Sequence, residues 1–174
     1  MACIGIFYGS TSGKVENIAF EIQKILGKEN ADVIDIKTAI KPSFRKYKYL
    51  IFGTSTEYGN IQKDWVLKIP LIKKLDYTHK KVAIFGLGDQ KLYPDTFADG
   101  MGVLFDLLND SDVDIIGNWY PHGYVFQRSK ALVNGSFVGL VLDENFQPNI
   151  TQIRLNKWTD YLKSQIKEVN FPQQ

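Results

Sequence analysis

Apolar residues along the chain follow two patterns. Continuous apolar runs predict β-strands at 2–8, 32–36, 48–53, 81–86, 113–117 and 138–142. Between these runs, apolar residues recur every three or four positions, which predicts helices at 13–27, 61–74, 95–109 and 151–168 and a short helix or turn at 41–46. Runs without polar alternation are typical of strands covered on both faces. We therefore expect an α/β fold with a doubly wound parallel sheet and helices on both faces.

A long polar and aromatic stretch, 118–137, separates the last two apolar runs. We interpret it as an insertion that interrupts the fifth and last strand, with some strand content of its own. The length of 174 residues suits one domain over 1–174. In the last helix, Thr151 is the predicted N-cap. The stripe that follows predicts core packing, through Leu155, Trp158, Leu162, Ile166 and Val169.

The loop 9–14, Gly-Ser-Thr-Ser-Gly-Lys, lies between the first predicted strand and the first predicted helix. Free N–H groups at a helix N-terminus bind anions, and three hydroxyls add further donors. The loop therefore predicts a phosphate site. It is not a Walker A loop, because only three residues separate Gly9 from Gly13 and Val15 follows Lys14. The later stretch 86–91 does not match the dinucleotide-binding fingerprint either, because Lys91 stands where the third glycine should follow Gly86 and Gly88. An ordinary turn of small residues is the alternative.

Two further loops, 54–60 and 86–93, leave the carboxyl ends of neighbouring predicted strands. Ligands of doubly wound sheets bind at this edge. Each loop carries one tyrosine, Tyr58 or Tyr93, among glycines and polar residues. Two aromatic faces beside a phosphate site suit a mononucleotide with a large flat ring. A single loop tyrosine is more often a packing residue.

Composition limits which classes of protein the chain can belong to. No apolar run approaches the roughly 20 residues that span a bilayer. No signal peptide is visible, and the single cysteine, Cys3, is expected to be buried in the first strand. These features fit a reducing intracellular compartment. With His79 and His122 far apart in sequence, we expect no metal site.

Charge is distributed unevenly along the chain. The net charge is only +2, but residues 41–81 carry ten Lys/Arg against three Asp/Glu, and residues 82–118 carry one Lys against seven Asp. No basic stripe is interleaved with aromatic residues, so nucleic-acid binding is not expected.

The chain resembles the flavodoxins, specifically their long-chain members. The matching motifs cover nearly the whole chain in family order: 7–14 (Phe-Tyr-Gly-Ser-Thr-Ser-Gly-Lys), 61–65 (Ile-Gln-Lys-Asp-Trp), 86–90 (Gly-Leu-Gly-Asp-Gln) with Tyr93, 129–132, 137–140 and 142–145. The stretch 118–137 matches the long-chain insertion. The resemblance implies a flavodoxin-like sheet of order 2-1-3-4-5, noncovalent FMN, and a low-potential one-electron carrier that is not an enzyme. It further implies a cytoplasmic monomer whose partners are redox proteins such as a ferredoxin/flavodoxin-NADP reductase, with no nucleic-acid or membrane partner.

The resemblance also implies which residues bind FMN. The phosphate loop would use Ser10, Thr11, Ser12, Gly13, Lys14 and Val15. The second loop would contribute Ser55, Thr56, Glu57, Tyr58, Gly59 and Asn60, and the third Leu87, Gly88, Asp89 and Tyr93. Tyr93 is expected on the outer face of the flavin ring. The inner face is expected to be covered by Tyr58, with Glu57 as the alternative.

Three departures from the family pattern stand out. Val15 occupies a position that usually carries Thr. Glu57 stands where long-chain members often have Trp, and its loop is one residue shorter in this chain. The chain is also not strongly acidic.

An FMN-dependent reductase with its own small substrate is the alternative function, and NADPH oxidation by the isolated protein would distinguish it. A signalling receiver domain would need acidic residues after the first strand and a phosphoacceptor Asp after the third. Residues 8–14 and 53–56 contain no acid, so this class is disfavoured.

Three mechanistic expectations follow from the resemblance. Electron-rich rings near Asp89, with no cation opposite, should disfavour the fully reduced anionic flavin and lower the second reduction potential. The acids Asp89, Asp95 and Asp99 should orient basic partners toward the flavin. Gly59 should let a peptide of its loop turn its carbonyl toward the reduced flavin, because glycine tolerates positive φ.

Overall fold

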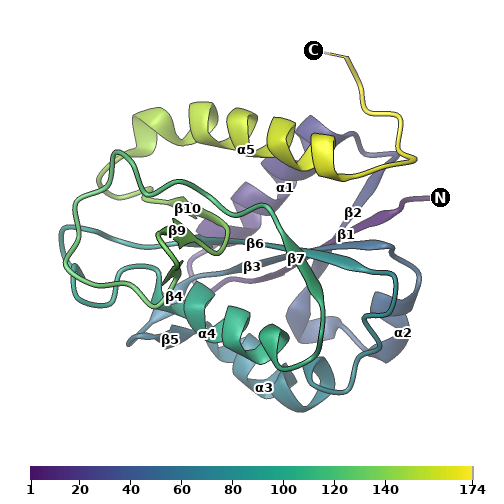
Figure 1. The fold of residues 1–174 in the computed structure, drawn as a ribbon, viewed down its shortest axis with the longest axis horizontal. Coiled ribbons are helices and arrows are strands. Elements are labelled where there is room, and N and C mark those ends of the chain that lie inside the picture. The colour runs from purple at the N-terminus through teal and green to yellow at the C-terminus, as the bar shows by residue number, and fades with distance from the viewer. Residues whose placement is uncertain (174) are drawn as a thin grey trace.

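The computed structural model describes residues 1–173 and contains one parallel sheet between two layers of helices (Figure 1). Its strands are β1 (Ile4–Gly9), β2 (Ala31–Asp35), β3 (Tyr49–Thr54), β6 (Lys81–Leu87), β7 (Asp114–Ile116) and β10 (Leu140–Leu142). The helices are α1 (Lys14–Leu26), α2 (Lys41–Arg45), α3 (Lys63–Ile72), α4 (Asp99–Asn109) and α5 (Thr151–Gln165). Two short helical turns, η1 (Ile36–Thr38) and η2 (Pro148–Ile150), precede α2 and α5. The expected doubly wound α/β fold is confirmed.

The strand order is β2-β1-β3-β6, and the fifth position is shared by β7 and β10. β7 pairs with the first half of β6, in register Lys81 to Asp114, whereas β10 pairs with the second half, in register Phe85 to Leu140. The expected order 2-1-3-4-5 and the interruption of the last strand are thus confirmed.

The sheet is apolar on both faces because alternate side chains enter two different cores. From β1, Phe7 points toward α2, α3 and α4, whereas Ile6 points toward α1 and α5. From β6, Ile84 packs in the same core as Phe7, and Phe85 packs in the same core as Ile6. All four are fully buried. This explains why the strands appear in the sequence as continuous apolar runs.

The insertion between β7 and β10 folds onto the α4 side. It contains a hairpin, β8 (Leu132–Val133) with β9 (Ser136–Phe137), and Trp119 forms an isolated bridge with Phe137. Tyr124 accepts a hydrogen bond from the Trp119 indole at 2.9 Å and donates one to the Val141 carbonyl. The insertion is therefore anchored to the last strand, and its expected strand content is confirmed.

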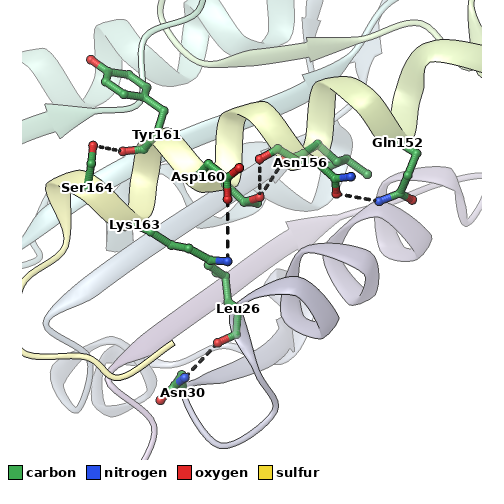
Figure 2. A network of polar contacts seen from close by, with 10 residues as sticks. Leu26, Asn30, Gln152, Asn156, Asp160, Tyr161, Lys163 and Ser164 are labelled. Carbon is green, nitrogen blue, oxygen red and sulfur yellow. Dashed lines mark hydrogen bonds and ion pairs between the residues drawn. The ribbon is translucent and has the colours of Figure 1, made fainter. Parts of the chain in front are cut away.

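Polar contacts run along α5 and reach the end of α1 (Figure 2). Gln152 donates to Asn156 at 3.0 Å, and Lys163 lies 3.9 Å from Asp160 one turn earlier. Beneath them, the Asn30 amide donates to the Leu26 carbonyl at 2.8 Å at the end of α1. Exposed pairs of this kind contribute little to the free energy of unfolding.

Two local expectations were wrong. Cys3 precedes β1 and is exposed, so it is not a buried strand residue. Thr151 is the first residue of α5 and its hydroxyl donates to the Glu144 carboxylate, so it does not cap the helix. The turn η2 places the helix boundary one residue earlier than the N-cap preference predicts.

Candidate functional site

A cleft of about 680 Å³ opens at the carboxyl edge of the sheet. Four loops surround it, following β1, β3, β6 and β10. Its volume is typical of a small-molecule site. The residues that line it are Ser12, Lys14, Ser55, Thr56, Glu57, Tyr58, Gly59, Leu87, Gly88, Asp89, Tyr93, Thr96, Ala98, Glu144 and Asn145.

The loop after β1 ends at an unblocked helix N-terminus. Gly13 is the N-cap of α1 with φ of +87°, and no side chain caps the helix. A side chain at Gly13 would meet nothing within 4 Å, so the space in front of the helix is open. The first intrahelical bond runs from the Asn17 N–H to the Gly13 carbonyl at 3.0 Å, which leaves the preceding N–H groups of α1 without helical acceptors. Such groups bind an anion.

The hydroxyls of this loop have partners within the protein. Ser10 accepts a hydrogen bond from the Gly13 N–H at 3.0 Å and so shapes the turn. Thr11 donates to Glu57 and accepts from the Gln62 amide at 3.3 Å. Val15 is buried in the core under α1, so it can contribute only its backbone N–H. The loop therefore offers backbone donors, with Ser12 and Lys14 facing the cleft.

The loop after β3 is a small hairpin, β4 (Thr56–Glu57) with β5 (Asn60–Ile61). Its two turn residues, Tyr58 and Gly59, both have positive φ, +52° and +74°. That combination defines the type I′ turn, whose twist matches an antiparallel pair. Tyr58 is fully exposed at its tip, while Thr56 accepts from the Gly100 N–H at 3.0 Å.

A buried hydroxyl in the same loop lacks a partner. Ser55 Oγ lies in the wall of the cleft, and no atom of residues 1–173 hydrogen-bonds to it. Buried polar groups in proteins are almost always paired. This hydroxyl is consistent with a polar ligand in the cleft.

The loop after β6 is organised by one carboxylate. Asp89 accepts from the N–H groups of Lys91 at 3.0 Å and Leu92 at 2.7 Å, and from the Asn145 amide at 3.0 Å. Burial tends to raise the pKa of Asp89. The hydrogen bonds from Leu92, Asn145 and Lys91, together with the charge of Lys14, outweigh burial and hold this pKa below 3.8. Asp89 is therefore ionised at neutral pH.

A second carboxylate holds this loop from behind. Asp143, directly after β10, is fully buried and accepts from the Gln90 N–H at 3.0 Å and the Gln90 amide at 2.9 Å. It also accepts from the N–H groups of Asn145 and Phe146 at 3.2 and 2.8 Å. Gln90 in turn accepts from the Val125 N–H at 2.6 Å, which connects the insertion to the cleft. Asp143 thus joins two cleft loops to the insertion.

The two predicted ring-stacking residues differ in their setting. Tyr93 lines the cleft with 63% of its surface exposed, and its N–H donates to the Asp89 carbonyl at 3.0 Å. Tyr58 also lines the cleft but stands free at the hairpin tip. Glu57, the alternative to Tyr58, faces the phosphate loop through its bond with Thr11.

Most predicted site residues come together in this cleft. Those that do not line it are Ser10, Thr11, Gly13, Val15 and Asn60. Sequence reasoning missed Thr96 and Ala98, which precede α4, and Glu144 and Asn145, which follow β10. The last two could have been found, because they also follow the carboxyl end of a strand. Lys14 donates to Asn145 within the cleft, and its charge acts on Asp89.

The proposed acidic docking surface is not formed as expected. Asp89 and Asp99 are only 8% and 4% exposed, and Asp99 accepts from the Lys130 N–H at 2.7 Å. Only Asp95 is exposed, and it lies 3.7 Å from Arg128. The buried acids shape loops and cannot contact a partner directly.

Two other features are absent from residues 1–173. No group of three His, Cys, Asp or Glu side chains is placed to hold a metal ion. None of the helices in that range is long and apolar enough to cross a membrane.

Comparison with known proteins agrees with the sequence motifs and the fold. A family model described as flavodoxin matches residues 6–158. A flavodoxin of Haemophilus influenzae is 44% identical over 160 residues, covering 91% of this chain and 92% of its own. Flavodoxin 1 of Escherichia coli K12 is 41% identical over 168 residues, covering 95% and 96%. The crystal structure of Fusobacterium nucleatum flavodoxin bound to flavin mononucleotide has a TM-score of 0.90 at 29% identity and covers 96% of this chain and 100% of its own. The chain belongs to the flavodoxin family.

Proposed function

We propose that this protein carries single electrons between redox proteins on a noncovalently bound FMN. The observation that supports this most directly is the cleft, where an open helix N-terminus and two tyrosine-bearing loops face the same space. The unpartnered Ser55 hydroxyl fits a polar ligand there. When bound, FMN supplies the redox chemistry, and the protein supplies binding and electrostatics.

The phosphate end of FMN belongs at the N-terminus of α1. Backbone N–H groups of the loop 10–15 donate to the phosphate, and Ser12 and Lys14 face it from the cleft. Thr11 reaches the phosphate only if its hydroxyl leaves Glu57. The Glu57 carboxylate therefore weakens phosphate binding in two ways: it occupies the Thr11 hydroxyl, and it places negative charge beside the anion site.

The ring end of FMN belongs between the loops after β3 and β6. Tyr93 would hold the outer face of the ring, and Tyr58, at the hairpin tip, would cover the inner face, since both line the cleft. Backbone groups of Thr56, Gly59 and Gly88 border the polar edge. The ionised Asp89 disfavours negative charge on the ring, so the second reduction occurs at a low potential. The positive charge of Lys14, which donates to Asn145 in the cleft, opposes this effect of Asp89.

The carrier function implies partner proteins and a compartment. We assign as partners a ferredoxin/flavodoxin-NADP reductase or another redox protein, and we place the protein in the cytoplasm as a monomer. Steady-state oxidation of NADPH by the isolated protein, without a partner, would contradict the carrier function.

Release of the cofactor tests the proposal. The purified protein should be yellow, and acid treatment followed by chromatography should yield one FMN per chain. FAD, or a folded preparation that binds no added FMN, would overturn the assignment. Ser12→Ala should weaken FMN binding because it removes a donor in the cleft, whereas Ser164→Ala on the outer side of α5 should leave binding unchanged.

A further inference from the structure

The outer face of α3 carries an exposed apolar stripe. Val66, Leu67 and Pro70 lie at the spacing of one helical face and are all exposed, Leu67 by 76%. The opposite face is in the core through Trp65 and Ile72. Core packing therefore does not explain the stripe.

Lysines frame this stripe at both ends. Lys63 precedes it by one turn, and Lys73 and Lys74 follow it on the same face. The ion pairs of residues 1–173 involve none of these three lysines. Their charge is thus not neutralised within that part of the protein.

The neighbouring segment extends the same chemistry. Lys68 donates to the Ala39 carbonyl at 2.8 Å and so joins α3 to the residues before α2. There, Ile40 is 59% exposed and is followed by the exposed Lys41. Ile40 and Lys41 therefore add an exposed apolar side chain and a lysine beside α3, where Lys68 joins the two segments. We call Val66, Leu67 and Pro70 with Lys63, Lys73, Lys74, Ile40 and Lys41 the α3 face.

The α3 face begins at the cleft. The Lys63 N–H donates to Glu57 at 3.4 Å, and Glu57 lines the cleft. From Lys63 to Ile72 the helix axis extends about 14 Å, and Lys73 and Lys74 lie in the turn that follows. A protein bound there has its edge beside the site from which electrons leave.

We propose that the α3 face docks a redox partner whose contact surface is apolar at the centre and acidic at the rim. This inference rests on the proposed carrier function. Charge complementarity selects the acidic partner, since Lys63, Lys73 and Lys74 form no ion pair within residues 1–173 and Asp89 and Asp99 beside the cleft are buried. The small apolar area suits the brief encounters of electron-transfer proteins. With FMN bound, the cofactor would supply one electron to the partner's oxidised centre.

Stopped-flow electron transfer tests the docking surface. Reduced, FMN-loaded protein is mixed with ferric cytochrome b5, an acidic haem protein, or with ferric cytochrome c, a basic one, at low and high salt. The wild type should reduce cytochrome b5 faster at low salt than at high salt. The triple variant Lys63→Glu, Lys73→Glu, Lys74→Glu should lose about tenfold of the low-salt rate with cytochrome b5 and should gain rate with cytochrome c.

A matched control separates the α3 face from net charge. Lys24→Glu, Lys28→Glu, Lys157→Glu changes the net charge equally, but its lysines are exposed on α1, the turn after it and α5, on the other side of the sheet. It should retain most of the cytochrome b5 rate. Equal losses in the two triple variants would overturn the proposal. Leu67→Ser should lower the high-salt rate about threefold if the apolar centre contributes.

Two further outcomes distinguish failure of the docking proposal from failure of the carrier function on which it rests. Failure to bind FMN, or to reduce either cytochrome, would overturn the carrier function itself. Normal transfer to both, without a salt-dependent preference for cytochrome b5, would overturn only the docking assignment. Sedimentation of the wild type, but not of the α3 triple variant, with phosphatidylserine vesicles would instead assign the face to an anionic membrane.

Discussion

The two loops that enclose the ring end of the cleft are built in opposite ways. The loop after β6 is held by two carboxylates: Asp89 accepts three hydrogen bonds, and the buried Asp143 accepts four. The hairpin after β3 ends in a two-residue turn with Tyr58 fully exposed at its tip. One wall of the cleft is held by many hydrogen bonds, which should make it rigid, and the other has few contacts at its tip.

This difference suits the chemistry of a one-electron carrier. A rigid wall holds an aromatic ring and a negative charge at constant positions, which keeps the reduction potentials constant. A lightly held turn with two residues of positive φ can change its peptide orientation when the bound ring gains a proton. The comparison predicts that substitutions in the rigid wall affect stability and binding, whereas those in the hairpin affect redox behaviour.

The largest effect is expected at Asp143. Asp143→Asn replaces one acceptor oxygen with a donor facing the Gln90 N–H and amide, so the free energy of unfolding should fall by about 3 kcal/mol. FMN affinity should fall with it. Urea unfolding and FMN titration measure both. Asp95→Asn, an exposed acid in the same region, is the control and should change stability by less than about 0.5 kcal/mol. Similar stability of the two variants would contradict a rigid wall.

Tyr93→Ala should have the next largest effect. Loss of the stacked ring should weaken FMN binding about tenfold and raise the second reduction potential, because an electron-rich ring no longer lies against the reduced anion. Fluorescence titration and potentiometry measure these quantities. Tyr120→Ala, an exposed tyrosine of the insertion that does not line the cleft, should change neither. An unchanged potential in Tyr93→Ala at full occupancy would remove Tyr93 from the ring site.

Gly59→Ala tests the hairpin. An added Cβ would make only ordinary contacts, with Thr96 at 3.5 Å and Asp99 at 3.9 Å, so the cost, about 1 kcal/mol, comes from the backbone at φ of +74°. The two reduction potentials should move closer together, while oxidised FMN stays bound. Gly135→Ala offers the same strain, at φ of +82° in the β8–β9 turn, away from the cleft. If both variants leave the potentials unchanged, Gly59 is only a turn residue.

The smallest effect concerns pH. The pKa of Asp89 is lower in the folded protein than its ordinary 3.8, so its carboxylate stabilises the fold above that pH. This contribution is lost as the pH falls below 3.8 and through the folded-state pKa. Asp89→Asn should therefore reduce the acid dependence of urea unfolding below about pH 4. An identical pH dependence in wild type and variant would show that other carboxylates govern acid unfolding.

The sequence was most informative where one residue type has one physical consequence. Uninterrupted apolar runs such as 48–53 predicted a sheet covered on both faces, and Gly9 and Gly13 around three hydroxyls predicted an open helix N-terminus. It was less informative about exposure. Asp89, Asp95 and Asp99 form one acidic cluster in the sequence, but only Asp95 faces solvent.

What the sequence by itself determined is the order of strands and helices and the edge at which their loops meet, because hydrophobic periodicity and turn residues are local signals. Only the tertiary structure decided that Asn145 reaches Asp89, that Asp143 connects two loops to the insertion, and that Lys63, Lys73 and Lys74 frame one apolar stripe. The physical reason is that hydrogen bonds and surface patches depend on which distant segments pack together, and local periodicity does not encode that pairing.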